Sequence, residues 1–427
     1  MPGRWRAAVL AALGALAGVV AQAQDFTTLK GHGGPVTAIA VSPSGQVLTA
    51  SFDNSLGLWQ GRVPRWLEGH DAAVTAAIFT NDGVPVSGSD DFTVRIWGEA
   101  PRILGSHRGK VTALAASPDG RYVASASWDG TIRLWPLVPG EAARQLADPG
   151  AGVNALAFDA VGRLFAGTLD GRLIRYDEAA SMPVPLARHG FGINELVAGP
   201  GWVAYGAVDG GTRVIDPENG ALIADFTLER RPILALAWHR GTDQLAVGDG
   251  QGYIMIIDTA RWRIARDFRA TRRGPVWALA FSTDGKVIYA GGLDDVAYAW
   301  PVALLDRFDP ANAIRSTVPR AEAEMPNGQR QFVRRCSICH ALDAGPSRKA
   351  GPSLHGLFGR RAGTLAGYPY SPTLKGSDIV WNEATVDALF GEGPDRFIPG
   401  SKMPTQVIAA PEDRADLIAY LRRATSE

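Results

Sequence analysis

The chain has 427 residues, of which 46% are hydrophobic and 20% are charged, a composition typical of globular proteins. Its 43 basic residues balance 43 acidic ones, so the whole chain has no net field that would attract nucleic acid or an anionic membrane. This length exceeds what one hydrophobic core usually serves, and we expect two domains once a leader has been removed.

The first 23 residues have the pattern of a secretory signal peptide. Arg4 and Arg6 precede an apolar stretch over residues 7–20, and a small-x-small triplet ends at Ala23. That stretch is about 14 residues long, whereas a membrane span needs roughly 20. We therefore expect cleavage after Ala23, export to the periplasm, and no membrane span in the mature protein.

Segments of about 40 residues then repeat one pattern of three short alternating strands separated by turn residues. The strongest copies cover residues 37–59, 75–97 and 112–135, and four weaker copies follow, which makes seven. In five copies a tight turn carries an aspartate, whose short side chain bonds its own backbone: Asp53, Asp91, Asp129, Asp170 and Asp209. Gln251 breaks this run in the sixth copy.

These repeats resemble the WD-repeat propeller family. The resemblance rests on Gly31-His32, Gly69-His70 and the degenerate Ser106-His107, and on tryptophans at strand ends, namely Trp59, Trp97, Trp135 and Trp300. It implies an all-β, seven-bladed propeller over residues 24–302, in which residues near 25–30 complete the seventh blade and close the ring.

Five histidines of this region are candidate metal ligands. In the family that it resembles, the histidines at positions 32, 70 and 107 bond the turn and strand of their own blade, and we expect that structural role here. His189 and His239 stand isolated, with no neighbour at ligand spacing, and we expect a surface or packing role for both. The repeat pattern stops after residue 302, and residues 303–325, punctuated by prolines, are predicted to be a linker.

The two cysteines of the chain, Cys336 and Cys339, stand in the pentapeptide CSICH, which ends at His340. Two thiols at this spacing can each add across a vinyl group of haem, while the next residue places an imidazole beneath the iron. A thioredoxin-like redox pair would need a βαβ setting, and a zinc ribbon would need two more cysteines. The motif therefore predicts one covalently attached haem c, with His340 as an iron ligand.

Residues 328–425 resemble the class I cytochromes c, the mitochondrial type and its bacterial relatives. Gly328 and Phe332 lie on one helical face before the motif, and Leu417, Tyr420 and Leu421 share a face near the end of the chain. The resemblance implies an all-α cytochrome c domain, taken as residues 326–427, in which these two helices cross with the glycine at the crossing.

The same resemblance implies the remaining haem contacts. Met403 matches the second iron ligand, with Met325 and His355 as the other candidates, and the Pro352 carbonyl accepts the ring N–H of His340. Four further residues match side chains that hydrogen-bond the haem propionates: Arg360, Tyr370, Trp381 and Ser401. One departure is that many relatives have a tyrosine near the methionine, where this chain has Leu389 or Phe390.

Charge around the haem is the second departure. Residues 326–427 contain 13 basic and 10 acidic residues, a net of +3, so the lysine ring of the mitochondrial relatives is only partial. Its members here would be basic residues interrupted by Asp395: Arg335, Arg348, Lys349, Arg396 and Lys402. We expect docking that is weaker and less sensitive to salt than that of a strongly basic cytochrome.

An arginine-rich stretch of the propeller leaves two interpretations open. Six arginines fall within one outer strand and the loop after it: Arg261, Arg263, Arg266, Arg269, Arg272 and Arg273. They could dock an acidic partner or meet haem propionates, or they could keep an exposed edge strand soluble.

The predicted function is that of a one-electron carrier rather than an enzyme, because two axial ligands leave no open position at the iron. The propeller would dock a redox partner, such as a membrane respiratory complex or a periplasmic dehydrogenase or reductase. One alternative is a propeller enzyme whose second cofactor passes electrons to the haem, although the propeller offers few ligands for one. Another is a binding module whose affinity follows the haem redox state.

Overall fold

The structure is a computed structural model that describes residues 27–138, 140–177, 182–230, 232–271, 274–305, 325–345, 347–399, 401, 403 and 406–426. The predicted signal peptide, residues 306–324 of the predicted linker, Arg272, Arg273 and Lys402 lie outside these ranges. Among the described residues, no helix has the length and apolar character needed to cross a membrane.

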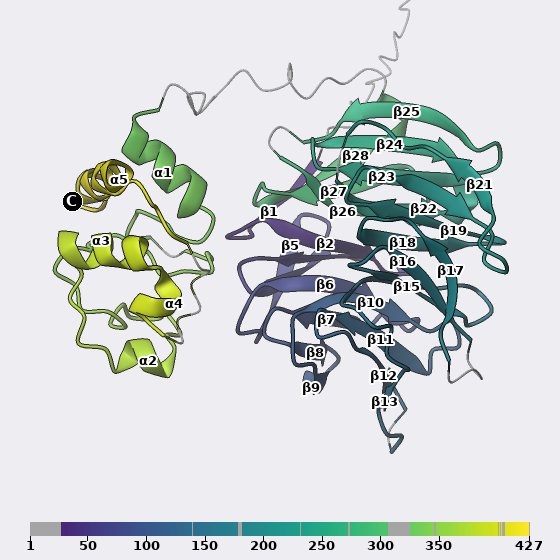
Figure 1. The fold of residues 1–427 in the computed structure, drawn as a ribbon, viewed down its shortest axis with the longest axis horizontal. Coiled ribbons are helices and arrows are strands. Elements are labelled where there is room, and N and C mark those ends of the chain that lie inside the picture. The colour runs from purple at the N-terminus through teal and green to yellow at the C-terminus, as the bar shows by residue number, and fades with distance from the viewer. Residues whose placement is uncertain are drawn as a thin grey trace, which may run out of the picture.

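Seven four-stranded antiparallel sheets form a ring, which confirms the predicted propeller (Figure 1). The first three blades consist of β2 (Val36–Val41), β3 (Val47–Ser51), β4 (Ser55–Gln60) and β5 (Val63–Glu68); β6 (Val74–Phe79), β7 (Pro85–Ser89), β8 (Thr93–Ile96) and β9 (Arg102–Ser106); and β10 (Val111–Ala116), β11 (Tyr122–Ser127), β12 (Ile132–Pro136) and β13 (Arg144–Gln145).

The next three blades consist of β14 (Val153–Phe158), β15 (Leu164–Thr168), β16 (Arg172–Tyr176) and β17 (Val184–Arg188); β18 (Ile193–Gly199), β19 (Trp202–Ala207), β20 (Thr212–Ile215) and β21 (Leu222–Asp225); and β22 (Ile233–His239), β23 (Gln244–Asp249), β24 (Tyr253–Asp258) and β25 (Arg263–Arg269). The first strands of neighbouring blades contact one another around the centre of the ring.

The seventh blade joins the two ends of the propeller sequence. It combines β26 (Val276–Phe281), β27 (Val287–Gly292) and β28 (Val296–Pro301) with β1 (Thr27–Lys30), the first strand of the chain. β1 pairs antiparallel with β28, so that Thr27 lies opposite Ala299 and Lys30 opposite Val296. The expected closure by residues near 25–30 is therefore confirmed, and the ring has no open edge between its first and last blades.

Hydrogen bonds from the first strands tie neighbouring blades together. The second residue of the strand donates its side chain to a backbone carbonyl of the next blade at 2.5–3.1 Å in five cases: Thr37 to Val74, Thr75 to Val111, Thr112 to Val153, Asn154 to Ile193 and Asn194 to Ile233. The sixth and seventh blades have Leu234 and Trp277 at this position, which lack a comparable donor for this bond. In five of the seven blades, a short side-chain donor thus links the first strand to that of the next blade.

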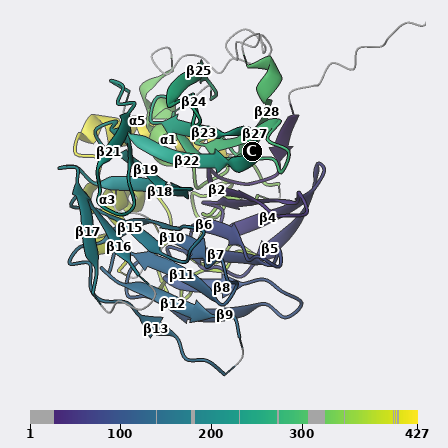
Figure 2. The same ribbon diagram turned by 90° about the vertical axis from the view of Figure 1, so that its right-hand side faces the viewer.

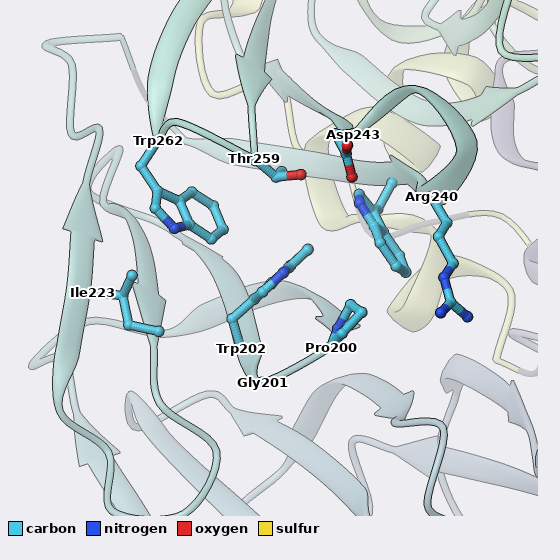
Figure 3. Close-up of a pocket in the computed structure, with 9 residues that line it drawn as sticks. Pro200, Gly201, Trp202, Ile223, Arg240, Asp243, Thr259 and Trp262 are labelled. Atoms are coloured by element: carbon cyan, nitrogen blue, oxygen red, sulfur yellow. The ribbon is translucent and has the colours of Figure 1, made fainter.

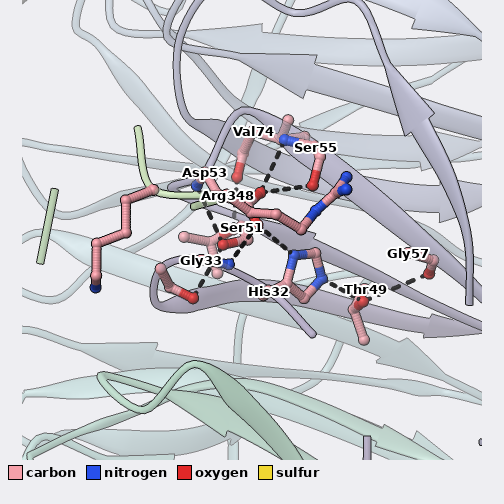
Figure 4. Close-up of polar contacts among 12 residues, drawn as sticks. His32, Gly33, Thr49, Ser51, Asp53, Ser55, Gly57, Val74 and Arg348 are labelled. Carbon is pink, nitrogen blue, oxygen red and sulfur yellow. Dashed lines mark hydrogen bonds and ion pairs between the residues drawn. The ribbon is translucent and has the colours of Figure 1, made fainter. Parts of the chain in front are cut away.

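The repeat histidines are structural, as the resemblance implied. The His32 ring lies between the Asp53 carboxylate, 2.9 Å from its Nδ1, and the Thr49 hydroxyl, 2.7 Å from its Nε2 (Figure 4). The Trp59 indole donates to the same hydroxyl at 2.8 Å. His70 repeats this arrangement with Asp91 at 2.8 Å. Each histidine is buried and has its two ring nitrogens occupied, so neither is free for a metal.

Two features of the weaker blades differ from expectation. His189 is not isolated: its Nε2 lies 2.8 Å from the Asp209 carboxylate, which makes it the histidine partner of that blade's turn. In the sixth blade, Asp249 replaces the missing turn aspartate, because its carboxylate accepts the backbone N–H groups of Gln251 and Tyr253. The same turn chemistry is therefore present, with its acid displaced by two residues.

The C-terminal part is helical, with α1 (Asn327–Arg335), α2 (Pro372–Lys375), α3 (Glu383–Glu392), α4 (Pro394–Phe397) and α5 (Pro411–Thr425). Its long connecting segments are irregular and include one isolated bridge between Arg361 and Val380, so the all-α expectation holds only in part. The helices lie at one face of the ring, beside it in Figure 1 and behind it in Figure 2.

One residue breaks the pattern of the propeller core. Six first strands place an alanine opposite a small residue of the second strand: Ala38, Ala76, Ala113, Ala155, Ala235 and Ala278. The fifth blade has Glu195 there, opposite Gly206. Burial raises the pKa of this carboxyl to about 8. The side chain therefore stays largely protonated at neutral pH, and ionising it costs folding free energy.

Replacing Glu195 with alanine is expected to stabilise the propeller in a pH-dependent way. The unfolded carboxyl ionises near the ordinary glutamate pKa of 4.5 and the folded one only near 8, so Glu195 lowers the stability progressively between these pH values. Glu195→Ala should raise the free energy of unfolding by about 2 to 3 kcal/mol at pH 7.5 and change it little at pH 4. Denaturant unfolding of the full chain across this pH range measures the effect.

The matched control is Glu99→Ala, which removes an exposed glutamate of the propeller. It should leave the pH profile of the wild type unchanged. Parallel profiles for Glu195→Ala and the wild type would show that Glu195 ionises freely in the folded propeller.

Candidate haem-binding site

The crossing of α1 and α5 positions the CSICH segment. Gly328 of α1 approaches α5 so closely that a Cβ there would lie 2.0 Å from the carbonyl oxygen of Asp416. One turn later the Phe332 ring packs on Tyr420, with 5.6 Å between ring centroids. α1 ends at Cys336, so the first thiol follows directly from the helix that this crossing fixes. The predicted crossing, with its glycine, is confirmed.

Both cysteines are free thiols set at the edge of the helical core. Cys336 is buried in a cluster with Phe332 and Leu417, and Cys339 is partly buried. Burial raises the pKa of the Cys336 thiol to about 12, and it raises the pKa of Cys339 as well. A thioredoxin-like pair would need a βαβ setting, whereas this segment follows helix α1 and, among the described residues, leads into irregular segments.

The ring of His340 is held by its surroundings. Its Nδ1 lies 2.8 Å from the Pro352 carbonyl, which can only accept, so Nδ1 carries the proton and Nε2 is left with its lone pair. Burial lowers the pKa of His340, which keeps the imidazole neutral. Gly351 packs against the ring, because a Cβ there would lie 2.4 Å from its Cε1. A neutral imidazole with a fixed orientation and a free Nε2 is what an iron ligand requires.

Met403 packs against the same hydrophobic cluster as Cys336. Its backbone N–H donates to the Ser401 hydroxyl at 3.1 Å, so Ser401 holds the backbone of Met403. The other two candidates lie elsewhere in the domain: Met325 is buried just before α1, and His355 sits in the loop after Pro352.

Two of the four predicted propionate residues, Arg360 and Trp381, lie at one loop. Arg360 donates to the carbonyls of Ser353 and His355, both at 2.8 Å, which ties the loop after Pro352 together. The backbone of Trp381 bonds that of Arg360 at 3.0 Å, and its ring packs on the cluster.

Sequence reasoning missed one residue of this neighbourhood. Tyr368 contacts Tyr370 with 4.7 Å between ring centroids and donates its hydroxyl to Ala350, next to Gly351. Burial raises the pKa of both phenols, that of Tyr368 to about 12. Both tyrosines stand in the segment GYPYS, but only Tyr370 matches a haem-contacting position of the family, so Tyr368 was not predicted.

The departure near the methionine involves two buried residues. Leu389 and Phe390 both lie on α3 and both pack in the hydrophobic cluster, with exposed fractions of 7% and 5%. Since both side chains are apolar, neither offers a hydroxyl to the cluster.

One member of the expected basic ring contacts the propeller instead. The Arg348 guanidinium stacks on the Trp66 ring at 4.0 Å and forms an ion pair with Glu68. The backbone of Gly33 also approaches that of Arg348, since a Cβ at position 33 would lie 2.1 Å from the Arg348 carbonyl carbon. Arg348 therefore joins the two domains at the first blade and does not stand free around the haem.

The donor set fits a covalently attached haem. It combines two neutral thiols at CxxC spacing, a buried neutral imidazole with a free Nε2 and a thioether on one hydrophobic cluster. Joined to a ring of seven blades, this site defines a haem protein with a WD-type propeller.

Comparisons with known proteins agree with this class. A cytochrome c family model matches residues 325–425, and the WD domain, G-beta repeat model matches residues 24–60, 61–98, 98–136 and 263–300. Through its C-terminal domain the chain belongs to the cytochrome c family, which implies a haem c cofactor and an electron-transfer partner.

The similar proteins include cytochromes c of plants and of an alga. Cytochrome c of Nigella damascena is 43% identical over 101 residues, which are 23% of this chain and 89% of that protein. Cytochrome c of Gossypium barbadense is 46% identical over 100 residues, which are 23% of this chain and 88% of that protein. Cytochrome c of Chlamydomonas reinhardtii is 41% identical over 112 residues, 26% of this chain and 99% of that protein.

A methyl group at the helix crossing should destabilise the cytochrome c domain. Gly328→Ala places a Cβ against the backbone of α5, which must move, and we expect the free energy of unfolding to fall by about 3 kcal/mol. Denaturant unfolding followed by helical circular dichroism measures it. Gly345→Ala is the control, because a Cβ there meets nothing within 4 Å. Equal stability of the two variants would mean that the helices do not cross this closely.

Proposed function

We propose that this chain is an exported one-electron carrier with a single haem attached through Cys336 and Cys339 and ligated by His340 and Met403. The observation that carries the proposal is the bond from His340 Nδ1 to the Pro352 carbonyl, which leaves Nε2 for iron. It stands within a domain that is 41–46% identical to cytochromes c.

When bound, the haem supplies a reversible one-electron change at its iron, and a thioether ligand favours the ferrous state relative to a second imidazole. The chain supplies the rigidity that such a carrier needs. Pro352 and Gly351 fix the His340 ring, and Ser401 holds the backbone of Met403. If His340 and Met403 both hold the iron, they would leave no position on it for a substrate, which is why we propose a carrier rather than an enzyme.

The proposed export is compatible with the fold of the propeller. Cleavage after Ala23 would leave β1, which begins at Thr27, intact for pairing with β28. The mature chain would then meet its redox partner in the periplasm, where a respiratory complex, a dehydrogenase or a reductase could occupy that role.

The propeller is the proposed docking scaffold for that partner. Because Arg348 stacks on Trp66, the first blade and the cytochrome c domain present adjoining surfaces to an incoming protein. Arg348 also forms an ion pair with Glu68, so one basic residue fewer remains to attract an acidic partner. This supports docking that depends less on salt than that of a strongly basic cytochrome.

Substitution of Met403 tests whether its sulfur is the second iron ligand. Met403→Ala should abolish the weak far-red absorption band that a ferric haem shows when a thioether sulfur is bound, because it removes the sulfur. Met325→Ala, which removes the other candidate methionine, should leave the band and its intensity unchanged. Visible spectra of the purified ferric proteins decide the matter. A band that survives in Met403→Ala and disappears in Met325→Ala would assign the sulfur ligand to Met325.

A further inference from the structure

A pocket of about 460 Å³ opens between the fifth and sixth blades of the propeller (Figure 3). It is built from the β18–β19 turn, the β22–β23 turn, the β24–β25 turn and Ile223 of β21. The β18–β19 and β22–β23 turns lie at the C-terminal ends of the first strands of the fifth and sixth blades. Gly33, which contacts Arg348 of the cytochrome c domain, lies at the N-terminal end of β2, the first strand of the first blade. The pocket therefore lies on the face of the ring opposite the cytochrome c domain.

Three tryptophans are among its nine lining residues. Trp202 stands 5.2 Å from Trp238 at an interplanar angle of 80°, and 5.4 Å from Trp262 at 88°. The Trp202 ring is thus nearly perpendicular to the rings of Trp238 and Trp262, so the three rings face the pocket in different directions. Rings in this arrangement can contact a compact cation on more than one side.

Two of the lining residues, Asp243 and Trp262, have a positive backbone φ angle. In the turn after the first strand, six blades have glycine at positive φ: Gly45, Gly83, Gly120, Gly162, Gly201 and Gly285. The sixth blade has Asp243 there, at φ 49°. In the turn between the third and fourth strands, Trp262 adopts φ 50°, where the first and fifth blades have Gly61 and Gly220.

A side chain at positive φ strains the backbone, and for a residue as bulky as tryptophan this is exceptional. Among the described residues, four other than glycine have positive φ, and two of them, Asp243 and Trp262, line this one pocket. The repeat itself shows that glycine satisfies both turns. The side chains of Asp243 and Trp262 are therefore retained for what they contribute to the pocket.

One acidic and one basic side chain line the pocket, Asp243 and Arg240, so a cation is favoured on the side of Asp243. Asp243 and Thr259 lie side by side above the tryptophans, and Arg240 extends away from Trp202 and Trp262 (Figure 3). Within the part of the chain that the structure describes, the Asp243 carboxylate has no hydrogen bond or ion pair. A carboxylate without a partner at the edge of an aromatic enclosure adds to the attraction of tryptophan faces for a cation.

We propose that this pocket binds a small quaternary ammonium compound, with its methylated head enclosed by Trp202, Trp238 and Trp262. The Asp243 carboxylate balances the charge of the head. A volume of about 460 Å³ accommodates a solute of this size with room for bound water. The site would give the propeller a ligand of its own, independent of the haem.

Calorimetric titration of the full-length haem-loaded protein tests the proposal, with choline as the probe and 3,3-dimethyl-1-butanol as its uncharged analogue of the same shape. Choline should bind with a dissociation constant of about 1 mM or below, and the uncharged analogue at least about tenfold more weakly, because only the cation is attracted to the ring faces. Absence of choline binding at about tenfold this concentration, or equal binding of the analogue, would overturn the proposal.

Two variants install the glycine that other blades use in these turns. Asp243→Gly relieves the positive φ of an exposed residue, and its melting temperature should equal or exceed that of the wild type. Trp262→Gly also removes a ring that packs against the cluster around Trp202, and its melting temperature should fall. Each should weaken choline binding by about tenfold or more. Gly61→Ala in the corresponding turn of the first blade is the control and should leave the affinity unchanged. Unaltered affinity in both glycine variants would show that choline binds elsewhere.

Discussion

The pairing of β1 with β28 is the constraint on which the propeller depends. Each blade is held on both sides by the next, through packed first strands and through bonds such as that from Thr37 to Val74, and the last blade has its outer strand only because β1 supplies it. Without β1, β28 would expose an unpaired edge next to the first blade. The N-terminal residues of the ring are therefore as important to its stability as any central strand.

The cytochrome c domain obeys a different constraint, the close crossing of α1 and α5 at Gly328. This crossing sets the end of α1, hence the position of Cys336 and, through the turn that follows, the ring of His340. Its hydrophobic cluster contains no propeller residue, so the two domains have separate cores. The contact of Arg348 with Trp66 and Glu68 joins them on the surface only, with the cysteine-bearing segment near the first blade.

Much of this could be predicted from the sequence because the decisive signals are local. CSICH contains both cysteines proposed to attach the haem and one proposed iron ligand within five residues, and the first three blades carry the histidine, aspartate and tryptophan of the repeat at regular spacing. His189 was missed because Gly190 follows it instead of preceding it. A search for histidine about 20 residues before each turn aspartate would have found it.

The features that could not be predicted depend on contacts between distant segments. The tryptophan pocket unites three turns of two blades, and neither Trp202 nor Trp262 stands at a position that the repeat marks. The anomalous φ of Trp262 follows from the turn geometry, which only the folded blade reveals. Glu195 could have been noticed, because six aligned strands have alanine at its position, but its burial could not. Likewise, the contact between Arg348 and Trp66 joins residues about 280 positions apart.

The most direct test of the account is the difference spectrum of the reduced full-length protein with and without carbon monoxide at neutral pH. Carbon monoxide binds ferrous haem only where an axial position is open. If His340 and Met403 occupy both positions, the spectrum of the reduced protein will not change on addition of the gas. A rapid shift of the haem bands to those of a carbon monoxide complex would contradict the account, since it would show an iron site open to a substrate.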